Sequence, residues 1–148
     1  MNYLLDTNII ITYSRENALA RRIEKQYQLL DGQHNLYISV VSLGEIDSYV
    51  KKFGIGRKKQ STIQKTLELT YQIDIGYQEI ISKYGDIEAF SQGKAKLPGH
   101  SFTARNMGKN DLWIAATASH YQLTLLTTDR DFDHLDQAFL ELAYIHPE

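Results

Sequence analysis

The amino-acid sequence predicts an α/β protein, a three-layer α/β/α sandwich around a mainly parallel central sheet. The main observation is that short apolar, β-branched runs alternate with longer stretches of helical spacing. This alternation is typical of parallel strands joined by crossover helices. The 148 residues are enough for one sizeable core, and no linker, repeat or low-complexity tract divides them. We therefore expect residues 1–148 to form a single domain.

The first half of the chain is expected to hold two strands and four helices. An apolar run that stops abruptly at Asp6 predicts the first strand. Leu19, Ile23 and Tyr27 recur at helical spacing, and Asp31-Gly32 ends that helix. The run Leu-Tyr-Ile-Ser-Val-Val predicts a second strand. The expected bounds are strands at 3–5 and 36–41, and helices at 8–14, 18–30, 42–53 and 58–71.

The second half continues the alternation after an ambiguous segment. Ile80, Tyr84 and Ile87 follow helical spacing, as do Leu112 and Ala115 further along. Between these two helices lies a long stretch with one proline and two glycines, which predicts a loop. The expected bounds are a short strand at 73–75, a helix at 78–93, the loop at 94–108, a helix at 110–121, and strands at 123–127 and 139–145.

Composition excludes several classes of site. The chain has no cysteine, so disulfides, cysteine-ligated zinc and a thiol nucleophile are excluded. The N-terminus lacks a basic segment followed by an apolar run, so we expect no secretory signal. No apolar run is long enough for a membrane span. A cytoplasmic protein is the expectation.

The positive charges are unevenly distributed, although the net charge is only -2. Ten of the 16 lysines and arginines fall in two windows without any acid, 51–65 and 94–109. Solvated faces are the ordinary explanation for such runs, but two of them also suit a basic surface beside an acidic site. The basic residues expected to contact nucleic acid are Lys51, Lys52, Arg57, Lys58, Lys59, Arg105 and Lys109. Aromatic side chains near them could stack unpaired bases.

Two acids follow the first two predicted strands. Asp6 comes directly after the first strand and could simply cap the next helix. Glu45 lies three residues after Ser42, which is the capping-box pattern. Each acid therefore has a structural explanation. Each would also lie at the carboxyl edge of a parallel sheet, where ligands bind in open α/β folds.

Two more acids stand at corresponding places later in the chain. Asp111 opens an apolar helix and shares a face with Ile114 and Ala115, which turns its carboxylate toward the core. An acid there is costly unless it is paired, hydrogen-bonded or bound to a metal. Asp129 follows an apolar strand that ends at Thr127. The Asp-x-Asp-x-Asp run at 129–133 lacks the glycine and glutamate of a calcium loop.

Carboxylates that share one pocket repel each other and take up protons unless a cation compensates them. Hard oxygen ligands suit Mg²⁺ or Mn²⁺ better than zinc. Such ions can activate a water for in-line attack on a phosphodiester. The acids therefore predict a divalent-metal phosphoryl-transfer site that acts by hydrolysis.

The sequence resembles the PIN domain, and specifically the VapC-type toxins of bacterial toxin–antitoxin pairs. The resemblance spans nearly the whole chain in order, and its most specific parts are the two later segments. The segments that carry it are Leu5-Asp6-Thr7-Asn8-Ile9, Ser42-Leu43-Gly44-Glu45-Ile46, Asn110-Asp111-Leu112-Trp113-Ile114-Ala115-Ala116-Thr117-Ala118 and Thr127-Thr128-Asp129-Arg130-Asp131-Phe132. The basic 94–108 connection departs from it, because many relatives shorten this stretch.

The resemblance implies a dimeric endoribonuclease that cleaves RNA phosphodiesters with a metal-activated water and is inhibited by a cognate antitoxin. It implies that Asp6, Glu45, Asp111 and Asp129 form an acidic quartet that holds Mg²⁺ or Mn²⁺. Asn8, Thr127 and Asp131 would be supporting residues. The implied products carry 5′-phosphate and 3′-hydroxyl ends.

Three alternatives are weighed against this hypothesis. A phosphatase of the haloacid-dehalogenase type needs a second aspartate two residues after the first, where this chain has Asn8. A receiver-like phosphoacceptor needs an early adjacent acid pair, which is absent. A non-catalytic PIN-like module that binds RNA or protein stays open, and metal-dependent RNA cleavage distinguishes it from the enzyme.

Overall fold

Five short strands form the centre of the molecule, and the computed structural model describes all residues, 1–148. The strand order is β3-β2-β1-β4-β5, and each neighbouring pair is parallel. The strands are β1 (Asn2–Leu5), β2 (Asn35–Ser39), β3 (Thr70–Ile73), β4 (Thr124–Thr127) and β5 (Glu141–Tyr144). The predicted α/β sandwich is confirmed, with a sheet that is parallel throughout.

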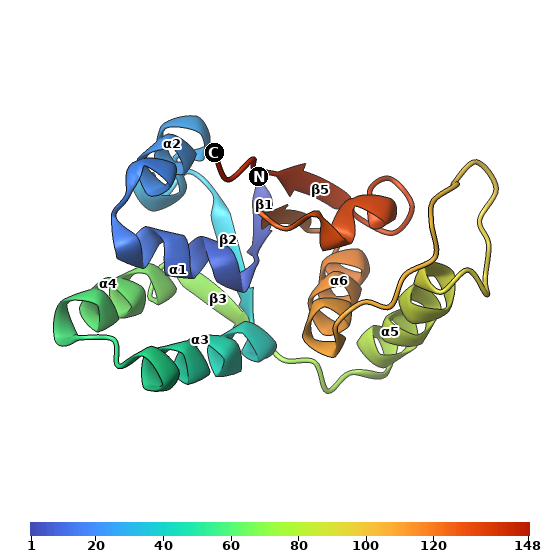
Figure 1. The fold of residues 1–148 in the computed structure, drawn as a ribbon, viewed down its shortest axis with the longest axis horizontal. Coiled ribbons are helices and arrows are strands. Elements are labelled where there is room, and N and C mark those ends of the chain that lie inside the picture. Colours follow the sequence, from blue (N-terminus) through green and yellow to red (C-terminus); the bar gives the residue numbers. More distant parts are fainter.

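Helices cover both faces of this sheet. Helices α1 to α4 pack on one face, while α5 and α6 lie side by side on the other (Figure 1). The helices are α1 (Thr7–Arg15), α2 (Ala18–Tyr27), α3 (Val40–Phe53), α4 (Arg57–Leu67), α5 (Gln78–Ser91) and α6 (Lys109–Tyr121), with 3-10 turns η1 (Leu29–Asp31) and η2 (Arg130–Leu135). None of these helices has both the length and the apolar character needed to cross a membrane.

Alternation along the central strands divides the interior into two cores. In β1, Leu5 packs against the α1 side and Leu4 against the α6 side, and both side chains are buried. In β4, Leu126 and Leu125 divide in the same way. Successive side chains of a strand point to opposite faces, so a strand covered on both faces is apolar at every position. This explains why the strands read as continuous apolar runs.

The predicted end of the fourth helix, at Tyr71, is wrong. Helix α4 stops at Leu67, and the chain turns at once into the edge strand β3. The Thr70 hydroxyl donates to the Leu67 carbonyl over 2.7 Å, which stabilises the turn. Thr70 then pairs with Leu36 in the parallel register of β2. Hydrogen bonds to a neighbouring strand thus replace the helical ones, a tertiary effect that local spacing does not reveal.

The predicted start of the third helix is also wrong. The strand expected to reach residue 41 ends at Ser39, and α3 begins at Val40. The Ser39 hydroxyl accepts from the Val41 N–H over 3.1 Å and caps the helix. Ser42 is therefore inside the helix, and the capping box between Ser42 and Glu45 does not form. Both side chains are available for other contacts.

Smaller boundary errors have local causes. The helix expected to reach residue 30 ends at Tyr27, because Gln28 adopts a left-handed conformation with φ of 52°. The last strand begins at Glu141 instead of 139, because the backbone N–H groups of Phe139 and Leu140 bond to Leu135 in a turn.

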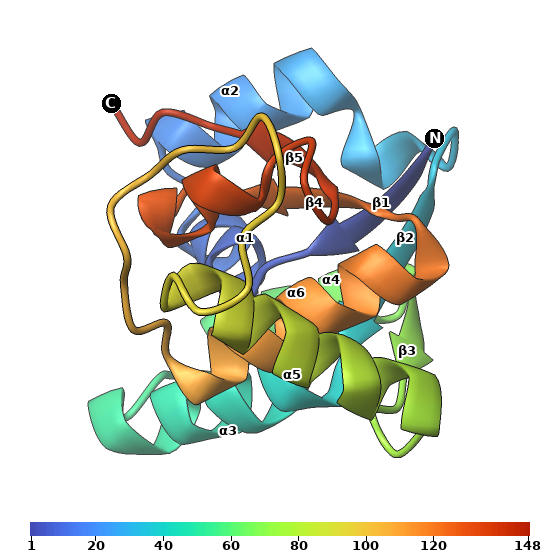
Figure 2. The same cartoon turned by 90° about the vertical axis from the view of Figure 1, so that its right-hand side faces the viewer.

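The long connection between α5 and α6 has no regular structure, as predicted for 94–108. Figure 2 shows it arching away from α5 and returning to the start of α6. Phe102 anchors it, with ring centroids 4.7 Å from Phe90 and 5.0 Å from His134. The His134 Nε2 atom lies 2.7 Å from the Ser91 hydroxyl. The loop therefore packs against η2, the turn that follows β4.

Candidate active site

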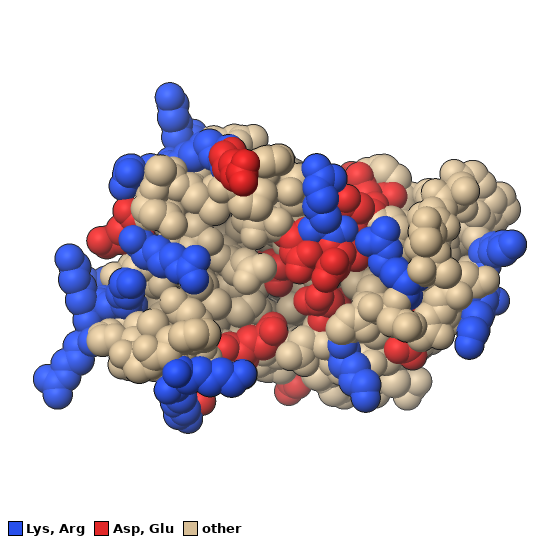
Figure 3. Space-filling view, viewed as in Figure 1, with Lys and Arg blue, Asp and Glu red and all other residues tan.

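The carboxyl ends of the parallel strands bring four predicted acids toward one edge. Asp6 follows β1, Asp129 follows β4, and Glu45 lies on α3, which leaves the end of β2. Asp111 reaches the same region from the first turn of α6. Figure 3 shows acidic side chains gathered in the middle of this face, with basic side chains around them. The topology thus brings together acids that are far apart in the sequence.

Asp6 is the most enclosed of these acids, with 3% of the residue exposed. The Thr7 N–H donates to its Oδ1 over 2.8 Å, so Asp6 does cap α1. The Thr127 hydroxyl donates to its Oδ2 over 2.6 Å. Burial raises the pKa of Asp6 to about 6, even though these two hydrogen bonds lower it. The capping role predicted as an alternative therefore coexists with a place in the acidic cluster.

Asp111 is half-buried at the start of α6, above the fully buried Ile114 and Ala115. Burial raises the pKa of Asp111 to about 7, and the charges of Asp6 and Asp129 add to the effect. Glu45 and Asp131 raise it further. The carboxyl groups are thus close enough to oppose one another's ionisation, as expected of acids that share one site.

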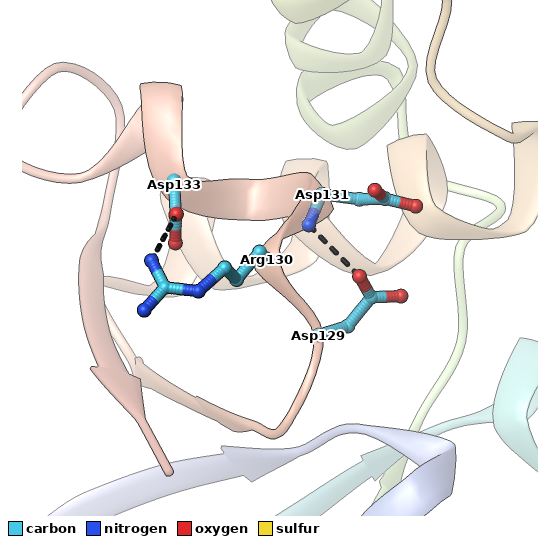
Figure 4. A network of polar contacts seen from close by, with 4 residues as sticks. All are labelled: Asp129, Arg130, Asp131 and Asp133. Carbon is cyan, nitrogen blue, oxygen red and sulfur yellow. Dashed lines mark hydrogen bonds and ion pairs between the residues drawn. The ribbon is translucent and has the colours of Figure 1, made fainter. Parts of the chain in front are cut away.

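The turn after β4 orients two further carboxylates. Asp129 caps η2 by accepting from the Asp131 N–H over 2.8 Å. Carboxylate oxygens of Asp111, Asp129 and Asp131 all lie within 4.8 Å of one another. Arg130 turns to the other side of the turn, where it pairs with Asp133 over 3.1 Å (Figure 4). The nearest cation in sequence is therefore engaged elsewhere.

Glu45 is held by Thr7, which was given no role from the sequence, and Ser42 takes part in a contact other than the predicted capping box. The Thr7 hydroxyl donates to Glu45 Oε1 over 2.7 Å. Ser42 Oγ lies 2.8 Å from the same Thr7 hydroxyl and must donate to it, since that hydroxyl's one proton goes to Glu45. In the sequence, Thr7 directly follows Asp6, and Ser42 precedes Glu45 by three positions. The contact between them depends on the pairing of β1 with β2, which places the starts of α1 and α3 together.

The donor set suits a hard divalent cation. Only two ion pairs form in the chain, Lys51–Asp47 and Arg130–Asp133, and neither involves a site acid. The cluster therefore holds several carboxylates without any compensating side chain, and carboxylate oxygens are the ligands that Mg²⁺ and Mn²⁺ prefer. Asp111 and Asp129 belong to the close triad with Asp131, whereas Asp6 and Glu45 lie outside it. The assignment of individual metal ligands stays a prediction.

Of the predicted supporting residues, Thr127 makes direct hydrogen bonds to Asp6 and Asp129, and the supporting role of Asn8 stays a prediction. Thr127 is buried, and its hydroxyl also accepts from the Asp129 N–H over 2.9 Å. Asn8 is exposed and lines a hollow together with Thr128. Asn110 lines a second hollow together with Glu45.

The predicted basic residues occupy three places in the fold. Lys52 lines the hollow that contains Glu45, whereas Lys51 is paired with Asp47 over 2.6 Å. Arg57, Lys58 and Lys59 are exposed on the first turn of α4, and Arg105 and Lys109 lie on the connection and at the start of α6. None of these residues except Lys51 forms an ion pair, so their charges are free to meet an anionic partner.

The sequence profile of the PIN domain matches residues 3–138, nearly the whole chain. No curated protein matches the sequence. The solved structures that resemble the chain include VapBC2 from Rickettsia felis bound to a DNA fragment from its promoter, with a TM-score of 0.73 and 23% identity over 98% of this chain and 99% of that one.

Two further structures have the same fold over nearly their full length. FitAcB from Neisseria gonorrhoeae has a TM-score of 0.65 and 21% identity, covering 98% of this chain and 97% of that one. VapBC-5 from Mycobacterium tuberculosis is a member of the VapBC family of toxin–antitoxin systems. It has a TM-score of 0.62 and 20% identity, covering 98% of this chain and 100% of that one. At these identities the likeness is one of fold, and function has to be argued from the site.

Proposed function

The chain belongs to the PIN domain family, and we propose that it is a divalent-metal-dependent endoribonuclease of the VapC toxin type. The observation that carries the proposal is the acidic cluster at the carboxyl edge of the sheet. Oxygens of Asp111, Asp129 and Asp131 lie within 4.8 Å of one another, and no basic side chain is paired with them. This arrangement favours binding of a cation and, through it, of a phosphodiester.

The acidic residues of the site differ in how they are held and in how readily they ionise. Asp6 is held at both oxygens and is buried, so its carboxylate keeps one orientation. The raised pKa values of Asp6 and Asp111 mean that their ionised forms are disfavoured, and a positive charge close to them would favour ionisation. Asp129 and Asp131, at the start of η2, lie close to Asp111. A bound Mg²⁺ or Mn²⁺ would supply Lewis acidity and a water of lowered pKa.

RNA is the proposed substrate. The residues that would contact phosphates are Arg57, Lys58 and Lys59 on α4, Lys52 on α3, Arg105 on the connection and Lys109 at the start of α6. Such contacts position the backbone and weaken as salt rises, but they do not read sequence. The proposal extends to a cognate antitoxin and a homodimer, supported by the likeness of fold to a family of toxin–antitoxin systems.

The test is a cleavage assay on an unstructured RNA with Mg²⁺ or Mn²⁺. We expect the wild-type chain to cleave it, EDTA to stop cleavage, and Asp6→Asn and Asp111→Asn each to lower the rate at least about 100-fold. Asp86→Asn, an exposed acid on α5, is the control and should cleave normally. Full activity in both site variants would refute the mechanism. Binding of RNA without cleavage by the wild type would favour the non-catalytic module.

A further inference from the structure

Helix α3, which carries Glu45, also carries an aromatic pair made of half-buried Tyr49 and exposed Phe53. Tyr49 and Phe53 are one turn apart with ring centroids 5.4 Å apart, and Phe53 is 71% exposed. Large apolar side chains are normally covered, so an exposed ring beside a polar hollow often marks a binding surface. No other aromatic side chain of the chain is as exposed as Phe53.

Helical spacing aligns this pair with the site. Glu45, Tyr49 and Phe53 are each four residues apart and therefore share one face of α3. Eight residues of helix span roughly 12 Å, so the face leads from the acids to the ring of Phe53 over two turns. In Figure 1, α3 runs from the centre of the molecule outward, in agreement with this direction.

Two hollows meet at the aromatic pair, and one of them contains the site acid Glu45. One, of about 480 Å³, contains Glu45 and Asn110 together with Lys52. The other, of about 530 Å³, contains Asn8 and Thr128 together with Arg15. Tyr49 and Phe53 line both hollows. The pair is therefore a ridge between two hollows, one with Glu45 and the other with residues that lie close in sequence to Asp6 and Asp129.

The groups along the two hollows match a nucleotide strand. Lys52 and Arg15 are exposed and form no ion pair, so each can meet a phosphate. Asn8 and Asn110 carry amides that can bond to base edges or sugars. An aromatic ring that stacks on an unpaired base, next to cations that contact the backbone, is the usual basis of single-strand binding.

We propose that Phe53, supported by Tyr49, stacks on an unpaired base of the RNA whose phosphodiester lies at the acidic site. The inference rests on the proposed function and names the side chain that would recognise an unpaired base of its substrate. Because a paired base cannot offer its face to Phe53, duplex RNA gains nothing from this ring. Phe53 is thus a residue that selects the substrate and has no role in the chemistry.

The test measures binding of a short unstructured oligoribonucleotide by fluorescence anisotropy in the Asp111→Asn background, which leaves the RNA intact. Phe53→Ala should weaken binding about five- to 150-fold, the loss of one stacked base. Phe53→Trp should restore it. Since Phe53 is exposed, these variants keep the fold. The matched control is Tyr71→Ala, because Tyr71 is 61% exposed on the edge strand β3, away from α3.

A series of oligonucleotides with a single abasic site, moved along the strand, locates the contact. At one position the abasic site should weaken binding as much as Phe53→Ala does, with no further loss when both are combined. Equal binding by Phe53→Ala and its parent would overturn the inference. The aromatic ridge would then be a candidate surface for binding protein instead of RNA. An equal loss for duplex RNA, or for Tyr71→Ala, would overturn it as well.

Activity separates this inference from the proposed function. With wild-type acids, Phe53→Ala should raise KM while kcat at saturating RNA stays unchanged. If RNA is cleaved with metal and both aspartate variants are inactive, yet Phe53→Ala has a normal KM, the stacking inference alone fails. If the wild type cleaves no RNA, the proposed function fails, and the stacking inference that rests on it fails too.

Discussion

The Thr127 hydroxyl donates to Asp6 Oδ2 over 2.6 Å, joining residues that are 121 positions apart. The hydroxyl oxygen of Thr127 also accepts a hydrogen bond from the Asp129 N–H over 2.9 Å. One hydroxyl therefore links the acid after β1 to the acid after β4, and the adjacent pairing of these two strands makes the contact possible. Thr127 fixes the relative position of two carboxylates without offering a carboxylate itself.

Replacing Thr127 with valine should disturb this link while keeping the side-chain shape. Asp6 loses a donor to its ionised form, so its pKa should rise above about 6 and the acid limb of activity should move to higher pH. The unpaired groups should lower the free energy of unfolding by about 1–3 kcal/mol. A pH–rate profile and urea unfolding measure both effects. Thr127→Ser is the control, and a valine variant with an unchanged profile would contradict the role.

Asp111 should make metal-free protein less stable as pH rises. Its pKa is about 7 in the folded chain and near 3.8 when unperturbed, so the folded state holds more protons between these values. Stability from this group is therefore lost as pH rises from about 4 to about 7. The Asp111→Asn variant cannot ionise at this position and so keeps its free energy of unfolding as pH rises. At pH 8 that free energy should exceed the wild-type value by on the order of 1–2 kcal/mol, after allowance for solvent screening.

At pH 4 the two proteins should be equally stable, since the wild-type carboxyl is then protonated in the folded state. Urea unfolding in EDTA at both pH values measures the difference. Asp86→Asn, on the exposed face of α5, should show no such gain. Greater stability of wild type at pH 8 would mean that Asp111 is compensated by a partner.

Asp131 should contribute to cation affinity as much as Asp129 does. Both have an oxygen within 4.8 Å of Asp111, although only Asp129 was predicted as a ligand. Asp129→Asn and Asp131→Asn should each weaken Mn²⁺ binding at least about tenfold. Isothermal titration calorimetry measures the affinity. Asp133→Asn is the control, because Asp133 is paired with Arg130 on the other side of the turn. Normal affinity in Asp131→Asn would limit this residue to a supporting role.

Lys58 and Lys59 should strengthen RNA binding through charge alone. Both are exposed at the start of α4 and form no ion pair. Replacing both with alanine should weaken binding most at low salt and reduce the slope of log affinity against log salt by about 1.4, about 0.7 for each phosphate contact to a single strand. Arg21 and Lys25 on α2, changed together to alanine, are a charge-matched control. Equal slopes for both double variants would assign the α4 lysines to an ordinary solvated face.

The order of the elements and the identities of the acids could be read from the sequence alone. Continuous apolar runs in β1 and β4 predict buried parallel strands, because both faces of such strands are covered. An acid directly after such a run must lie at the carboxyl edge of the sheet. Asp6 and Asp129 were predicted on this basis.

Tertiary structure decided the rest, because it depends on which strands are neighbours. Thr70 and Tyr71 fit a helix by local spacing, yet pairing with β2 makes them a strand. The early end of β2 at Ser39 frees Ser42 and Glu45 to meet Thr7. The η2 turn brings Asp131 beside Asp111. Contacts between residues distant in the chain set these positions, and spacing along one segment carries no information about them.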